Sequence, residues 1–149
     1  MQQESVERVQ LSHQQVVAQA GVFSAAFYVH LFELEPQLRP LFPADRTRLR
    51  AHLEAALSMV VDNLSDTEKL DRLLRDLGAQ HLGFGAQPHH YFVVRQALVA
   101  ALRDQAGDLW SRELEADWMR AISLVSSFML QGAAMETAVV SERFSRDAE

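Results

Sequence analysis

The strongest constraint on the fold comes from residues 70–91, which read LDRLLRDLGAQHLGFGAQPHHY. Four leucines recur on one face of a predicted helix: Leu70, Leu73, Leu74 and Leu77. The next position on that face is His81, and two glycines and Pro88 then end the helix. An imidazole therefore takes an inward position where a leucine is expected. Such a histidine can be a core residue, a cation at the helix end or a metal ligand.

The rest of the chain predicts more helices and no strands. Residues 1–10 are expected to fray at the start of a helix that ends near Ala20, and a second helix follows from about 22 to 35. Residues 36–43 (PQLRPLFP) predict a rigid corner, and a third helix runs from about 45 to 64. A capping box from Ser65 to Glu68 is expected to start the helix that ends near His81. Two further helices are expected from Pro88 and from about Ser111.

The predicted fold is therefore all-α, with six to eight helices in a single domain over residues 1–149. The charged tail from about residue 141 is expected to be disordered. A chain of this length buries enough surface for a core with a pocket inside it.

Composition excludes several classes of function. The net charge is −6 and the 14 basic residues form no block, which argues against nucleic-acid binding. There is no cysteine, so disulfides, thiolate metal sites and cysteine catalysis are excluded. No signal peptide or membrane-spanning run is visible, and we expect a cytoplasmic protein without a membrane partner.

The histidines argue against most protein-built metal centres. None of the six pairs with another at i, i+4, and no Glu-x-x-His or His-Glu-x-x-His motif occurs. No serine lies in a nucleophile elbow either. One inward ligand among leucines suits a metal that brings its own equatorial ligands. Haem is such a group, because the porphyrin supplies four nitrogens and the protein needs to add only one imidazole.

Residues 77–91 (LGAQHLGFGAQPHHY) resemble the proximal segment of globins, in particular bacterial single-domain haemoglobins, flavohaemoglobin globin domains and neuroglobin-like proteins. The shared pattern is Leu-Gly-x-x-His, a glycine-containing corner, and Pro-x-His-Tyr opening the next helix. Residues 27–43 resemble the aromatic-rich second helix and corner of the family, and the segment around Trp118 resembles its last helix. The resemblance covers about residues 8–136 and implies a globin fold around haem b, protoporphyrin IX iron.

The resemblance also implies roles for single residues. His81 would be the proximal iron ligand, Phe42 would stack on the porphyrin, and Tyr28 would be a distal hydrogen-bond donor. Tyr91 would approach the proximal histidine and orient it. The alternative for both tyrosines, stronger for Tyr91 than for Tyr28, is a core aromatic whose hydroxyl reaches a backbone carbonyl. Further apolar residues are expected to line the haem pocket: Leu49, Leu53, Leu77, Ala86 and Val94.

Leu49 departs from the family pattern, which usually has glutamine or histidine at this distal position. Leucine can neither donate a hydrogen bond nor bind iron, so Tyr28 becomes the main distal donor. His52 is the alternative: it would hydrogen-bond the gas, bind iron as a sixth ligand, or lie near a propionate or in solvent. Nearby cations would pair with the propionates or form a solvated face: Arg46, Arg48 and Arg50.

The function implied is reversible binding of O2, CO and NO, for oxygen storage or delivery or for NO detoxification. Residues 1–149 contain no flavin or NAD domain, so a nitric oxide dioxygenase activity would need a separate reductase. Two alternatives stay open: a globin-fold sensor or regulatory module, and a six-coordinate redox globin with His52 on the iron. We expect a monomer or a homodimer.

Overall fold

The computed structural model describes residues 1–83 and 86–147, except for the side chains of 138–145 and 147. The described part contains six α-helices, two short 3-10 helices and no strand, which confirms the all-α prediction. The elements are α1 (Gln3–Val16), α2 (Val22–Leu34), η1 (Pro36–Leu41), α3 (Thr47–Asp62), α4 (Thr67–Gly83), α5 (Pro88–Ala106), η2 (Gly107–Leu109) and α6 (Arg112–Asp147).

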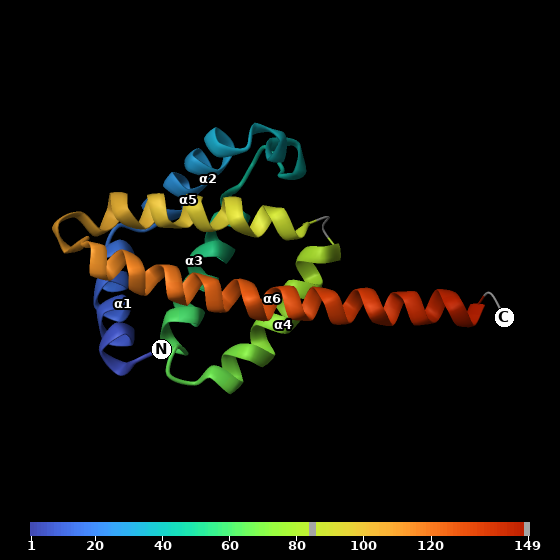
Figure 1. Cartoon of the computed structure of the whole chain (residues 1–149). Coiled ribbons are helices and arrows are strands. Elements are labelled where there is room, and N and C mark those ends of the chain that lie inside the picture. The colour runs from blue at the N-terminus through green and yellow to red at the C-terminus, as the bar shows by residue number, and fades with distance from the viewer. Residues whose placement is uncertain (84–85, 148–149) are drawn as a thin grey trace.

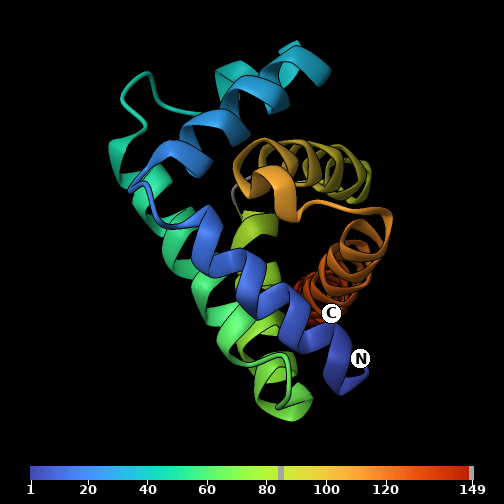
Figure 2. The same cartoon turned by 90° about the vertical axis from the view of Figure 1, so that its left-hand side faces the viewer.

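The helices cross one another around a single core (Figure 1). Two crossings dominate: α4 packs against α6, and α2 packs against α5. Helix α1 contacts α3, α5 and α6, and it runs across the near side of the molecule in Figure 2. Among the described residues, α3 packs on α1 and α2 but makes no extensive contact with α4. The helix that carries Leu49 and the helix that carries His81 are therefore held by different neighbours.

Backbone contact distinguishes the crossing of α4 and α6. A Cβ atom on Gly78 would lie 1.9 Å from the Met129 carbonyl oxygen, and one on Gly132 would lie 2.0 Å from the Arg75 carbonyl oxygen. Because real Cβ atoms do not approach carbonyl oxygens so closely, each helix needs glycine where it meets the backbone of the other. These two glycines fix the distance between α4 and α6.

Polar groups join α1 to α6. The Trp118 indole Nε1–H donates to the Ser12 hydroxyl at 2.9 Å, and the Arg8 Nε–H donates to the Asp117 carboxylate at 2.6 Å. Both Trp118 and Asp117 are almost fully buried, at 1% exposed each. Burial would raise the pKa of Asp117, but hydrogen bonds from Arg8 and Ser5 and the charge of Arg8 lower it overall.

Three predictions of local structure were wrong. Helix α1 is ordered from Gln3 because Val6 and Val9 are buried in the core, and it ends at Val16 rather than near Ala20. Asp66, not Ser65, caps α4, since its carboxylate accepts the Lys69 N–H at 3.2 Å.

The expectation of a disordered tail was also wrong. Helix α6 continues through Asp147, so its C-terminal part projects beyond the other helices in Figure 1. Periodic apolar residues are not needed to continue a helix that an earlier, well-packed segment has already nucleated. No helix in the described part of the chain is long and apolar enough to span a membrane.

Candidate haem site

Helix α4 carries His81 out of the core. Leu70 and Leu74 are fully buried, Leu77 is partly buried, and His81 one turn later is exposed. The prediction of an inward histidine at the end of a buried stripe was therefore wrong in one respect: the last turn leaves the packed core. Leu73 was also expected on the inward face and is 39% exposed. Residues on the Gly78 side of the helix meet α6 instead, because the glycine contact draws that side against α6.

The imidazole of His81 is held by its own helix. Its Nδ1 lies 2.8 Å from the Leu77 carbonyl oxygen. A carbonyl oxygen only accepts, so Nδ1 carries the proton, and in the neutral ring Nε2 keeps a free lone pair. Immediately after the helix, the Ala86 N–H donates to the His81 carbonyl oxygen at 3.0 Å. The ring is thus oriented with one nitrogen available to a metal.

The predicted apolar lining shares one property: its side chains pack on the core and remain partly exposed. The set comprises Phe42, Leu49, Leu53, Leu77, Tyr91 and Val94. They come from the η1 corner, α3, α4 and α5, and Ala86 between α4 and α5 is partly buried as well. Each of these side chains therefore keeps part of its apolar surface uncovered by the described part of the protein. A flat apolar group is the kind of ligand that they would cover.

Tyr28 belongs to an aromatic cluster at the α2 side. Its ring centroid lies 5.0 Å from that of Phe27, 5.6 Å from that of Phe42 and 6.0 Å from that of Phe32. Burial raises the pKa of Tyr28 against the opposing charge of Arg46, so the hydroxyl keeps its proton at neutral pH. It makes no hydrogen bond to any described residue, which leaves it available as a donor.

The side chains at the start of α3 differ in exposure and in their contacts. Leu49 is partly buried, whereas His52 and Arg48 are exposed. Arg50 donates to the Gly21 carbonyl oxygen at 2.8 Å and so ties α3 to the start of α2. The Arg46 guanidinium lies over the Phe32 ring, 4.7 Å from its centroid. Arg50 therefore has a bracing role that its sequence context did not indicate.

A polar-rimmed cavity of about 440 Å³ lies beside Tyr28, between α2 and the start of α3. Arg39, Arg46 and Asp45 are among the residues that line it. The Tyr91 hydroxyl is buried on the other side of the fold and has no hydrogen-bond partner. The two tyrosines thus face different surroundings, one against arginines and one between α5 and α6.

Comparison with known proteins decides the family. The sequence profile described as Globin matches residues 25–129, more than half of the chain. The chain belongs to the globin family. It is 29% identical over 107 residues to leghemoglobin 49 of Vicia faba, covering 64% of this globin and 73% of that protein. It is 27% identical over 138 residues to a flavohemoprotein of Rhizobium meliloti (strain 1021), covering 90% of this globin but only 32% of the longer protein.

Solved structures agree on the fold. An engineered carbene transferase from Rhodothermus marinus superposes with a TM-score of 0.83 at 23% identity, covering 95% of this globin and 99% of that chain. At this identity the likeness establishes the globin fold alone.

Family membership supports a haem-binding, gas-binding protein. The donor set fits such a group, because the hydrogen bond from His81 Nδ1 leaves Nε2 able to bind a metal and the predicted lining side chains are apolar and only partly buried.

The sequence did not predict how α6 packs against α4 and α5. Gly78 was part of the Leu-Gly-x-x-His pattern, but its contact with the Met129 backbone was not predicted. Gly132 is its counterpart on α6, and the spacing of a glycine on each of two helices is the only sequence signal for such a crossing. The surroundings of Arg95 on α5 were also missed, since the sequence pattern does not show which side of that helix stays open.

Proposed function

We propose that this globin binds haem b through Nε2 of His81 and uses it to bind diatomic gases reversibly, O2 above all and also CO and NO. Haem b supplies four equatorial nitrogens and an iron atom whose sixth position accepts a gas. The observation that carries the proposal is the 2.8 Å hydrogen bond from His81 Nδ1 to the Leu77 carbonyl oxygen. It leaves the other ring nitrogen free on an exposed side chain, one turn after the partly buried Leu77.

On the proximal side, the protein controls the strength of the imidazole as a ligand. The Leu77 carbonyl would fix the tautomer and the orientation of the ring, with Nε2 left as the ligand atom. Leu77 itself and Val94 would cover the porphyrin face. The Ala86 N–H donates to the His81 carbonyl oxygen and so fixes the backbone just after α4. Tyr91 would contribute its ring to this side.

On the distal side, Tyr28 is the proposed donor. Its protonated hydroxyl would donate a hydrogen bond to a bound gas that carries partial negative charge, which slows release of O2 more than release of CO. Leu49 and Leu53 would exclude water from the ligand without competing for it. Phe42 would hold both the porphyrin and the Tyr28 ring, against which it packs edge to face.

The first test is the ultraviolet–visible spectrum of the purified protein in ferric, ferrous and ferrous plus O2 forms. We expect a Soret band in the wild type that is lost or strongly altered in His81→Ala. His89→Ala is the matched control, because His89 is an exposed histidine on the next helix. An unaltered Soret band in His81→Ala would refute ligation by His81. Five-coordinate ferrous bands would exclude His52 as a sixth ligand.

The second test concerns the distal donor. Tyr28→Phe should speed O2 dissociation by roughly tenfold or more, since it removes one hydrogen bond to a partly charged ligand. Dissociation of CO, which carries less charge, should change little. Stopped-flow displacement measures both rates, and an unchanged O2 rate would remove Tyr28 from the mechanism.

The proposed physiological use is oxygen storage or delivery by a cytoplasmic globin. NO detoxification is the other use compatible with the relatives, since a flavohemoprotein is among them. Conversion of NO and O2 to nitrate consumes one electron per turnover, so a reductase would have to supply it. Steady-state NO consumption with and without an added flavin reductase distinguishes the two uses.

A further inference from the structure

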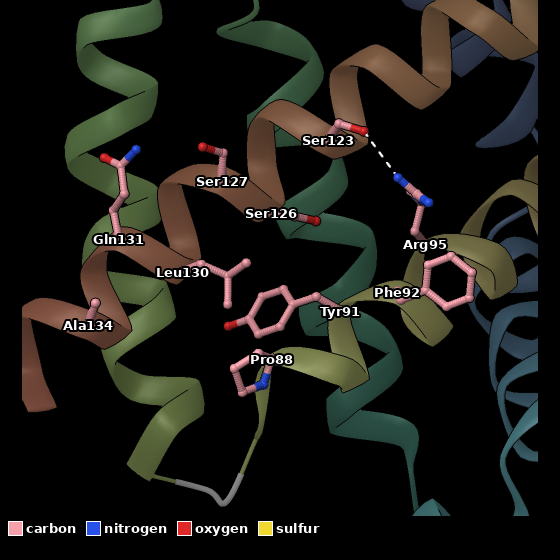
Figure 3. Close-up of a pocket in the computed structure, with 10 residues that line it drawn as sticks. All are labelled: Pro88, Tyr91, Phe92, Arg95, Ser123, Ser126, Ser127, Leu130, Gln131 and Ala134. Atoms are coloured by element: carbon pink, nitrogen blue, oxygen red, sulfur yellow. Dashed lines mark hydrogen bonds between the residues drawn. The ribbon is translucent and has the colours of Figure 1, made fainter.

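A groove of about 590 Å³ lies between α5 and α6, and Tyr91 lines both this groove and the candidate haem site (Figure 3). Three serines of α6 are among the residues that line it: Ser123, Ser126 and Ser127. Larger apolar side chains at these positions would fill the space between the helices. The volume is in the range of small-molecule sites, and neither His81 nor Phe42 lines it.

One end of the groove holds a cation without a counter-charge. Arg95 of α5 has no carboxylate within 4.0 Å among the described residues, and its Nε is buried without a hydrogen-bond partner. Its one hydrogen bond, to the Ser123 hydroxyl, is long at 3.5 Å. The guanidinium lies 5.3 Å from the centroid of the Phe92 ring, which keeps it at the groove.

Arg103, two turns further along α5, differs from Arg95 in having a carboxylate partner. It also lies over an aromatic ring, 5.9 Å from the centroid of Trp110, but it forms an ion pair with Glu115. The same helix thus presents one arginine with its carboxylate and one without. A guanidinium that is partly desolvated and unpaired favours an anionic ligand.

The other end of the groove is apolar. Pro88, Leu130 and Ala134 lie there with the Tyr91 ring, and the Tyr91 hydroxyl is buried without a partner (Figure 3). Among the residues that the structure describes, no acidic residue lines the groove. A ligand that matches the groove has a single negative charge at the Arg95 end and an apolar body that reaches Leu130.

We propose that this groove binds an amphipathic monocarboxylate, such as a medium-chain fatty acid. The carboxylate would accept hydrogen bonds from Arg95 and from the hydroxyls of Ser123 and Ser126. The hydrocarbon chain would lie along Tyr91 and Leu130. A single charge is favoured over a phosphate dianion because Arg95 is the one cation among the residues that line the groove. The proposal does not depend on the function of the haem site.

Isothermal titration calorimetry with dodecanoate, below its micellar concentration, tests the proposal. We expect saturable binding to the wild type and affinity at least about tenfold weaker for Arg95→Met, since a charge-assisted hydrogen bond is lost. Arg103→Met is the matched control and should bind like the wild type. Dodecanol, which has the same chain without the charge, should bind as weakly to the wild type as dodecanoate binds to Arg95→Met.

A second variant tests whether the ligand occupies the groove. Ser126→Leu puts a larger side chain into the groove without removing the cation, and it should also weaken dodecanoate binding. Four results would overturn the proposal: no binding to the wild type, equal binding by Arg95→Met, equal binding of dodecanol, or unchanged affinity in Ser126→Leu. A Soret shift on adding dodecanoate that persists in both variants would place the ligand at the haem instead and would likewise overturn it.

Discussion

Helix α6 meets α4 and α5 in opposite ways. Toward α4 it uses Gly132, and its backbone touches the backbone of α4 directly. Toward α5 it presents serines, and a groove of about 590 Å³ remains. The first contact tolerates no additional atom, whereas the second has room for a ligand. The close crossing holds the helix that carries His81, whereas the loose one joins two helices that do not carry it.

The largest expected effect comes from adding one methyl group to the close crossing. Gly78→Ala would place a Cβ atom 1.9 Å from the Met129 carbonyl oxygen, so the helices would have to separate. We expect a loss of at least about 2 kcal/mol in the free energy of unfolding, because backbone cannot move aside as a side chain can. Chemical denaturation followed by circular dichroism measures the loss.

Gly83→Ala is the matched control for this prediction. Gly83 ends the same helix, and a Cβ atom there would meet nothing within 4 Å. Its replacement should change stability by less than about 0.5 kcal/mol. If Gly78→Ala and Gly83→Ala were equally stable, the crossing would not be close-packed and the contrast between the two contacts of α6 would fail.

The sequence predicted the elements better than their contacts. Apolar periodicity located the helices, and Pro36 and Pro88 marked a corner and a helix start correctly, because these signals are local. The Leu-Gly-x-x-His resemblance indicated His81 but not that Leu77 orients its ring, although a carbonyl four residues earlier is the natural acceptor.

What the sequence could not give was the arrangement of one helix against another. A helical stripe shows which residues share a face, but not which neighbour that face meets. Leu73 was therefore expected inside and is exposed, and the pairing of Gly78 with α6 was not foreseen. For the same reason, Arg95 was not distinguished from Arg103, whose partner Glu115 lies on another helix.

A third contact of α6, with α1, should have an intermediate and pH-dependent effect. Asp117 is buried against Arg8, and its pKa in the folded state lies below the ordinary aspartate value of roughly 3.9. A lowered folded-state pKa stabilises the protein above the unfolded-state pKa, and this contribution is lost as pH falls through the folded-state value. Asp117→Asn should therefore be less stable than the wild type near neutral pH, by less than Gly78→Ala is.

Thermal unfolding across pH measures this effect. The difference between wild type and Asp117→Asn should stay constant from about pH 7 to pH 5 and shrink below about pH 4. Glu113→Gln is the control, since Glu113 is also near Arg8, at 3.4 Å, but its side chain is 69% exposed. It should change stability little. A difference for Asp117→Asn that persists undiminished at pH 2.5 would mean that the ion pair is not its source.

The smallest expected change is the one that adds the most volume. Ser126→Leu inserts a larger side chain between α5 and α6, where a groove already exists and no backbone clash is required. The leucine side chain would cover apolar surface of the groove without displacing other atoms. We therefore expect the free energy of unfolding to stay within about 0.5 kcal/mol of the wild-type value or to rise slightly. The same denaturation measurement compares it directly with Gly78→Ala. A loss as large as that of Gly78→Ala would show that α5 and α6 are as tightly coupled as α4 and α6, and the groove would then be a packed interface rather than a binding site.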